Sequence, residues 1–154
     1  MNDEIIIEVN EVFKKYDDAT VLDNVSLEIE KGKIYGLVGR NGSGKTVLMK
    51  CICGLIKPTS GEVKVAGKTV GKDVDIPEDI GVIIETPGFI PNYSGFKNLK
   101  LLASVRNKIS NEEIRKSMEI VGLEPKSRKH VGKYSLGMRQ KLGIAQAIME
   151  KPKI

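Results

Sequence analysis

The sequence predicts an α/β fold that combines an antiparallel β front, a core with a phosphate-binding loop, and a small α-helical subdomain. Three observations lead to this prediction. Residues 4–30 contain two strand-like segments, residues 39–46 are rich in glycine, and the residues after 94 have helical periodicity. A length of 154 residues suits one domain with a single core.

The β front is predicted from two strands and a hairpin. Residues 4–12 and 20–30 have the apolar patterns of strands, and residues 62–70, interrupted at Gly67, have the pattern of a tight hairpin. A strand pair ahead of a phosphate loop is unusual in a simple doubly wound domain. We therefore expect an antiparallel subdomain to be attached to the core.

Residues 39–46 fill every fixed position of the phosphate-binding pattern G-x-x-x-x-G-K-[ST]. They stand between residues 33–38, which are expected to form a short buried strand, and a helix expected to begin at Thr46. Glycine lets the backbone curl so that successive N–H groups face phosphate oxygens, and the helix dipole favours the same anion. The residues expected to bind phosphate are Gly39, Asn41, Gly42, Ser43, Gly44, Lys45 and Thr46.

Two side chains of this loop supply specific chemistry. Lys45 is expected to place its ammonium against the β- and γ-phosphates of a nucleotide, and the Thr46 hydroxyl is placed to bind Mg²⁺. The alternative is a glycine-rich turn between a strand and a helix that binds nothing. The match at every fixed position, in the expected context, favours the phosphate site.

A second candidate site residue follows another apolar segment. Residues 80–84 are expected to form a compact strand, and Glu85 stands at its exit, before Pro87 and Gly88. Open α/β sheets bind ligands at the carboxyl ends of their strands, so Glu85 is a candidate ligand of the metal and a contact of the attacking water. The alternative is a solvated glutamate in a loop.

Three helices are expected in the second half of the chain. The first begins near Ser94, the second opens with a capping box between Ser110 and Glu113, and the third has its N-cap near Ser135. The apolar face of the first is expected to consist of Phe96, Leu99, Leu102 and Val105. The N-terminus of the third helix is a potential anion site, although capping alone also explains Ser135.

Composition and charge exclude several classes of protein. No apolar run approaches the ~18 residues of a membrane span, and the acidic start at residues 1–4 is unlike a secretory signal, so a cytosolic chain is expected. The net charge is +5, but the basic residues are scattered, which does not support binding to nucleic acid. The excess fits an anionic nucleotide or a position near the negative inner leaflet of a membrane.

Taken in order, these motifs resemble the N-terminal two-thirds of the nucleotide-binding domain of ATP-binding cassette (ABC) transporters. Tyr16 matches the aromatic of the A-loop, residues 39–46 match the Walker A loop of this P-loop ATPase type, and residues 80–85 match the segment that ends in the Q-loop. Residues 134–138, Tyr-Ser-Leu-Gly-Met, match the signature usually written L-S-G-G-Q.

The resemblance implies a ligand, a metal and an assembly. The ligand is ATP with Mg²⁺, Tyr16 stacks on adenine, and Thr46 and Glu85 bind the metal. Ser135 and Gly137 close over the γ-phosphate held by a second nucleotide-binding domain, so that ATP joins a head-to-tail homodimer or a pair of such domains. A core or surface tyrosine is the alternative for Tyr16.

The sequence departs from the family in three places. Glu85 replaces the Gln of the Q-loop, and Leu136 replaces the first Gly of the signature, with further changes at its first and last positions. The sequence ends at Ile154, where the Walker B strand begins in the family, so we expect a piece of a protein about 60–90 residues longer. Residues 84–89 resemble the variant found in exporters of peptide antibiotics of the bacitracin and lantibiotic-immunity type.

Residues 1–154 are thus expected to be an incomplete nucleotide-binding domain, with residues 1–80 as the β front and P-loop core and residues 86–150 as the Q-loop and helical subdomain. It would be the ATPase subunit of an exporter, peripheral on the inner face of the cell membrane and bound to a transmembrane permease subunit. By itself it is not expected to hydrolyse ATP. Two alternatives are a nucleotide-binding regulatory or assembly module without catalysis, and an ABC-type ATPase acting on ribosomes or DNA, which would need a second cassette or long basic segments.

Overall fold

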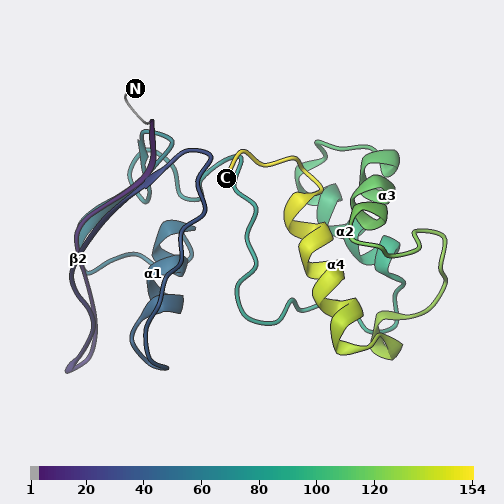
Figure 1. Ribbon diagram of the computed structural model, residues 1–154, viewed down its shortest axis with the longest axis horizontal. Coiled ribbons are helices and arrows are strands. Elements are labelled where there is room, and N and C mark those ends of the chain that lie inside the picture. The colour runs from purple at the N-terminus through teal and green to yellow at the C-terminus, as the bar shows by residue number, and fades with distance from the viewer. Residues whose placement is uncertain (1–3) are drawn as a thin grey trace. The chain divides into compact units, whose positions relative to one another are not determined.

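The structure is a computed structural model that describes residues 4–154. It divides between Glu78 and Asp79 into two compact units, and each is described by itself. The first unit holds all the β-strands and helix α1, and the second holds helices α2, α3 and α4 (Figure 1).

The first unit is built on a four-stranded antiparallel sheet with the order β2-β1-β3-β4. Strands β1 (Ile5–Tyr16) and β2 (Ala19–Glu30) form a long hairpin, and β1 also pairs with β3 (Ser60–Val65). A second, tight hairpin joins β3 to β4 (Lys68–Thr69), as expected from residues 62–70. The antiparallel front predicted from the sequence is therefore confirmed, although β1 continues four residues beyond the expected end at residue 12, to Tyr16.

Helix α1 (Lys45–Ile52) supplies the other side of the core in this unit and contacts β2 and β3. Its buried face is Leu48, Cys51 and Ile52. The buried apolar residues of the sheet are Ile7, Val9, Val12, Leu22, Val63 and Val65. Buried and more exposed side chains alternate along β1 and β3, so one face of the sheet lies against the helix that follows the glycine-rich loop.

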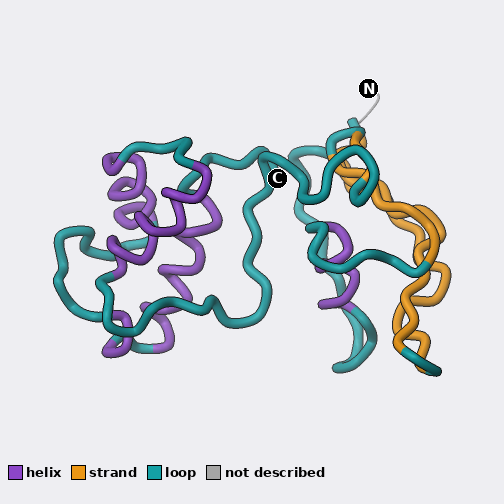
Figure 2. Tube along the Cα trace, turned by 180° about the vertical axis from the view of Figure 1, so that it is seen from behind, coloured by secondary structure: helices purple, strands orange, loops and turns teal. Residues whose placement is uncertain are grey.

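Residues 33–38 do not form the buried strand that the sequence predicted. They are drawn as loop in Figure 2, and within residues 4–154 no strand pairs with them. Ile34 and Val38 are 101% and 94% exposed. An apolar run becomes a strand only when another strand supplies its hydrogen-bond partners.

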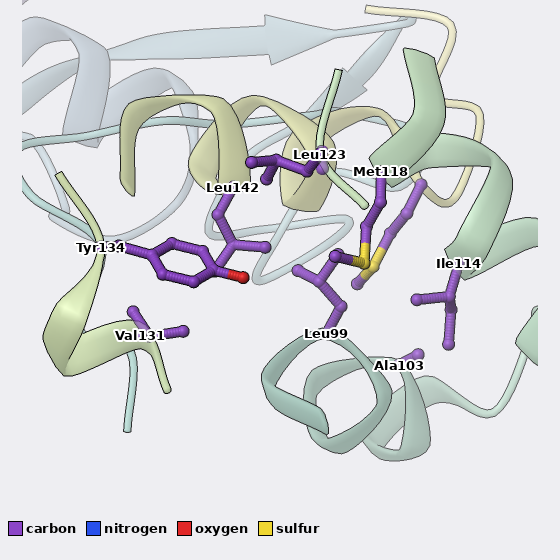
Figure 3. Packing of buried hydrophobic residues seen from close by; sticks show 10 residues of the cluster. Leu99, Ala103, Ile114, Met118, Leu123, Val131, Tyr134 and Leu142 are labelled. Carbon is purple, nitrogen blue, oxygen red and sulfur yellow. The ribbon is translucent and has the colours of Figure 1, made fainter. Parts of the chain in front are cut away.

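The second unit is a cluster of α-helices around its own core (Figure 3). Its elements are α2 (Gly95–Arg106), α3 (Asn111–Ile120), the short 3₁₀ helix η1 (Val131–Lys133) and α4 (Leu136–Ile148). The core residues are Leu99, Ala103, Ile114, Met118, Leu123, Val131, Tyr134, Leu142, Ala145 and Met149. The ring of Tyr134 therefore lies among aliphatic side chains of all three α-helices.

The three helix starts of this unit lie where the sequence placed them. Ser94 and Ser135 each accept a hydrogen bond from the backbone N–H three residues on, at Lys97 and Met138. Ser110 does so as part of a complete capping box with Glu113. These contacts are local, which is why the sequence alone predicts them.

The buried face of α2 differs from the prediction. Leu99 is fully buried and Ala103 is 4% exposed, whereas Val105 is 82% exposed. Residues spaced by three drift about 60° around a helix at each step, so Val105 lies on the side opposite Phe96. Steps of four, from Gly95 through Leu99 to Ala103, keep to the buried face.

Residues 80–84 are not a strand either, although the first residues of the segment form backbone hydrogen bonds with the end of the described chain. The Gly81 N–H donates to the Ile154 carbonyl (2.8 Å), and the Ile154 N–H donates to the Asp79 carbonyl (3.1 Å). This is the hydrogen-bond pattern of a parallel strand pair in which Ile80 faces Ile154. Within the described residues the pairing extends no further, so the strand prediction is wrong for most of the segment.

None of the helices formed by residues 4–154 combines the length and apolar character needed to cross a membrane.

Candidate functional site

The glycine-rich loop lines an open cavity of about 290 Å³ at the start of α1. The lining residues are Val21 and the residues of the loop and first helical turn, Asn41, Gly42, Ser43, Gly44, Lys45, Thr46 and Val47. Within the described chain, no side chain caps the N-terminus of α1, and its first turn has no acidic residue. Its free N–H groups and dipole are therefore available to an anion in this cavity.

Gly44 is the residue of the loop whose backbone most clearly requires glycine. Its φ is 86°, and a Cβ there would lie 2.6 Å from the carbonyl oxygen of Val21 on β2. Any side chain would therefore meet both a disfavoured backbone conformation and the neighbouring strand. The close approach packs the loop against β2 and fixes where α1 begins.

Lys45 folds its side chain back across the loop. Its ammonium donates to the carbonyl oxygens of Gly39 (2.6 Å) and Arg40 (2.7 Å), and lies 3.4 Å from the Ser43 hydroxyl. The positive charge is thus held by polar groups of the loop that lines the cavity. A phosphate in the cavity could replace these neutral acceptors with charged ones, which form stronger hydrogen bonds.

The donor set at the loop suits Mg²⁺ held mainly by a nucleotide. Thr46 lines the cavity and its side chain carries a hydroxyl oxygen, a ligand type that Mg²⁺ prefers. Among the residues that the structure describes, no three His, Cys, Asp or Glu side chains gather where they could hold a metal. Phosphate oxygens and water would therefore have to complete the coordination, as is usual for this ion.

Tyr16 ends β1 and pairs with Ala19 across the turn of the long hairpin. Tyr16 is 43% exposed, and the Lys14 ammonium lies 4.9 Å from the centre of its ring. Val21, two residues beyond Ala19, lines the loop cavity. Figure 1 shows that the turn of this hairpin and the tip of the glycine-rich loop lie at the same end of the first unit.

Ser135 and Gly137 lie at the exposed start of α4, in the second unit. The Ser135 hydroxyl accepts the Met138 N–H (3.2 Å). Gly137 has no positive φ, and apart from its chain neighbours and its own helix nothing in the described chain lies within 4 Å of where its Cβ would be. The fold itself therefore gives no reason for glycine at this position.

Tyr134, the residue before Ser135, is 4% exposed and anchors the start of α4 in the helical core. Burial raises the pKa of its hydroxyl, and a hydrogen bond from the Gly95 backbone opposes this shift. The carbonyl of Tyr134 accepts hydrogen bonds from the Arg139 guanidinium at 3.3 and 3.4 Å. The exposed serine thus follows directly on a rigidly held residue.

Glu85 is exposed and has a positive φ of 59°. It lies in the second unit together with Ser135 and Gly137, whereas Tyr16 and residues 39–46 lie in the first. The structure thus brings residues 41–46 of the Walker A loop together around one cavity, whereas Gly39 is not among the lining residues. The convergence of Glu85, Ser135 and Gly137 on a nucleotide stays a prediction.

Sequence reasoning missed a buried polar residue, Asn98, that supports the start of the signature helix. Asn98 is 3% exposed and accepts the Ile90 N–H (2.8 Å) while its amide donates to the carbonyls of Ile90 and Ser94 (both 3.1 Å). It therefore fixes residues 90–94, which in turn bind the backbone of Val131 and Gly132 ahead of the signature. An asparagine between apolar helix positions was the available signal.

The family profile described as ABC transporter matches residues 22–154. The chain belongs to the ABC transporter family. Over 149 residues it is 48% identical to an uncharacterized ABC transporter ATP-binding protein of Bacillus subtilis, YybJ, covering 97% of this chain and 68% of that protein. This confirms the resemblance drawn from the motifs of the sequence.

Other members of the ABC transporter family extend the comparison. The chain is 44% identical to the bacitracin transport ATP-binding protein BcrA of Enterococcus faecalis, covering 98% of this chain and 49% of that protein. It thus spans about half the length of this relative. A dimeric ATP-binding cassette in a post-hydrolysis state, bound to ADP and Pi, matches with a TM-score of 0.81 at 23% identity, over 96% of this chain and 71% of that one. That likeness confirms the fold class.

Proposed function

We propose that this chain is the ATP-binding part of the ATPase subunit of an ABC exporter. The observation that carries the proposal is the cavity at the uncapped N-terminus of α1, with Lys45 and Thr46 at its wall. A helix start that lacks a capping side chain and is lined by backbone N–H groups and an ammonium suits a phosphate chain. Family membership favours this function over a regulatory module without catalysis.

In this proposal the loop binds the phosphates and orients them. Lys45 exchanges the carbonyls of Gly39 and Arg40 for phosphate oxygens, and the Thr46 hydroxyl binds Mg²⁺. The metal neutralises charge on the β- and γ-phosphates when bound. Tyr16, on the hairpin that contributes Val21 to the cavity, stacks on the adenine ring.

The residues of the second unit complete the site in the whole protein. Glu85 contacts the metal and water at the γ-phosphate, and its charge makes binding more dependent on Mg²⁺ than the usual Gln would, because a carboxylate repels phosphate. Ser135 and Gly137 approach the γ-phosphate of a second nucleotide-binding domain. The open space around Gly137 supports this role. Because no neighbouring segment of this chain needs that space, the glycine leaves it to a partner molecule.

Transport requires a membrane partner. We propose that the whole protein acts from the inner face of the cell membrane on a separate permease subunit and exports a substrate. The relative named for bacitracin transport makes a peptide antibiotic a candidate cargo. Closure of two nucleotide-binding domains around ATP, followed by hydrolysis to ADP and phosphate, would drive the permease.

Calorimetric titration of the full-length protein with Mg·ATP tests the phosphate site. Lys45→Ala should weaken ATP affinity by about 10- to 100-fold, because each charge-assisted hydrogen bond to phosphate contributes roughly 1.5–3 kcal/mol. Lys50→Ala, at the other end of α1, is the control and should retain most of the affinity. Equal affinity for Lys45→Ala and the unaltered protein would overturn the assignment of the loop.

A further inference from the structure

The segment that carries Glu85 rests on α4 at both of its ends. Gly81 lies so close to the Ala147 carbonyl of α4 that a Cβ at position 81 would overlap it. At the other end, the ring of Pro87 lies 3.0 Å from where a Cβ at Gly143 would be. Gly143 and Ala147 are one helical turn apart and share a face of α4. Glu85 lies between these two points of contact.

The backbone of Glu85 has a conformation that needs support from its neighbours. A φ of 59° is disfavoured for a residue with a Cβ, and such conformations persist where surrounding contacts fix the chain. Here Gly81 is also hydrogen-bonded to Ile154 (2.8 Å). On the other side, the Phe89 N–H donates to the Pro87 carbonyl (3.0 Å), and the Phe89 ring packs against the helical core.

Gly143 is an unfavourable residue for the interior of a helix. It is buried near the middle of α4, where alanine would give a more stable helix. Its φ is not positive, so the backbone does not require glycine. Among the described residues outside α4, the close neighbour that a Cβ would meet is Pro87, and the glycine is therefore explained by the approach of this loop.

We propose that Gly143 is a positioning residue for Glu85. By leaving room for the Pro87 ring, it holds the Glu85 backbone on the same helix that begins at Ser135, eight residues or about 12 Å before Gly143. Glu85 and the signature serine are thus held by one rigid element. The inference rests on the proposed function for the metal role of Glu85, but the contact itself does not.

The test uses the full-length protein and four variants. Gly143→Ala forces the Pro87 ring to shift, and Pro87→Ala removes the ring. The double variant combines both changes. Gly88→Ala is the matched control, because Gly88 is next to Pro87 and has no positive φ. Apart from its chain neighbours, nothing among the described residues lies within 4 Å of where its Cβ would be. Thermal unfolding by circular dichroism establishes that each variant folds.

The first measurement is amide hydrogen exchange without nucleotide, relative to the intrinsic rates, at Gly81 and Phe89, whose N–H groups donate to the carbonyls of Ile154 and Pro87. Gly143→Ala and Pro87→Ala should each accelerate exchange by about fivefold or more, because the contact that restricts local opening is weakened. The double variant should match Pro87→Ala alone, since the added methyl group then meets no ring. If Gly143→Ala and Gly88→Ala exchange at the same rate, the positioning contact is refuted.

The second measurement is the Mg²⁺ dependence of ATP affinity, with Glu85→Gln as the reference. Gly143→Ala should reproduce at least half of the change that Glu85→Gln produces, and Gly88→Ala should reproduce little of it. A change in Glu85→Gln without any change in Gly143→Ala would overturn the positioning role. No change in Glu85→Gln, together with accelerated exchange in Gly143→Ala, would support the contact and overturn the metal role of Glu85.

Discussion

The hydroxyl oxygen of Tyr134 lies against Gly95 at the start of α2, and a Cβ at Gly95 would lie 2.7 Å from that oxygen. The same Cβ would lie 3.2 Å from side-chain atoms of Leu142 and Met118. Figure 3 shows the Tyr134 ring pointing into this cluster with its oxygen directed inward. The start of α2 and the residue before Ser135 are thus joined through a position that has no room for a side chain.

Gly95→Ala should therefore destabilise the protein by about 1–3 kcal/mol, as overpacking of a filled core does. Gly137→Ala is the matched comparison, because it also replaces a glycine in the first turn of a helix but in open space. It should raise stability by up to about 1 kcal/mol through helix propensity. Urea unfolding of both variants measures the difference, and equal stability of the two would contradict the packing role of Gly95.

Asn98→Ala should destabilise the protein by about 1–3 kcal/mol. The substitution removes the side-chain acceptor of the Ile90 N–H, and an unsatisfied group costs roughly 1–3 kcal/mol. The carbonyls of Ile90 and Ser94 each lose one donor but keep a backbone N–H, from Tyr93 and Asn98. Asn92→Ala, an exposed residue of the same loop, should change stability by less than about 0.5 kcal/mol. Denaturant unfolding monitored by circular dichroism compares the two, and a similar small effect for both would refute the role of Asn98.

Glu113 gives a prediction about acid stability. Hydrogen bonds from the Lys151 ammonium and the Ser110 backbone N–H lower its pKa to about 2. A carboxyl whose pKa is lowered by folding stabilises the folded state above its unfolded pKa of about 4.3, and this contribution is lost as the pH falls towards 2. Glu113→Gln keeps the capping box but removes the charge. The variant should have a lower Tm than the unaltered protein at pH 7, and the difference should shrink between pH 4.5 and 2. A difference that is constant with pH would contradict the prediction.

The signature residues give a prediction about assembly. The full-length protein should form dimers in the presence of a non-hydrolysable ATP analogue. Ser135→Arg should abolish these dimers, because a large side chain at the exposed start of α4 blocks the approach of the partner. Sedimentation velocity with and without the analogue measures the dimer. Gln140→Arg, an exposed change within α4, is the control and should still dimerise. Dimers of Ser135→Arg that persist would refute the interface.

Features that depend on neighbouring residues were predictable from the sequence by itself. The Walker A pattern, the capping serines at positions 94, 110 and 135, and the hairpin at Gly67 each rest on contacts within a few residues. Such contacts follow from residue type and spacing, so the structure has them where they were expected. The family followed from the order and spacing of the same motifs.

Features that depend on distant partners were decided only by the tertiary structure. Residues 33–38 and 80–84 have apolar patterns typical of strands. An apolar pattern does not show whether a neighbouring strand is present to form the hydrogen bonds that a strand needs. The buried positions of Gly95 and Gly143 are set by close approaches to segments far away in the sequence. That of Asn98 is set by the loop that folds back onto it from Ile90, eight residues earlier. The reason for glycine or asparagine at those positions is seen only once Tyr134, Pro87 and the Ile90 backbone are packed against them. Steric fit and buried hydrogen bonding are properties of pairs of residues rather than of single residues.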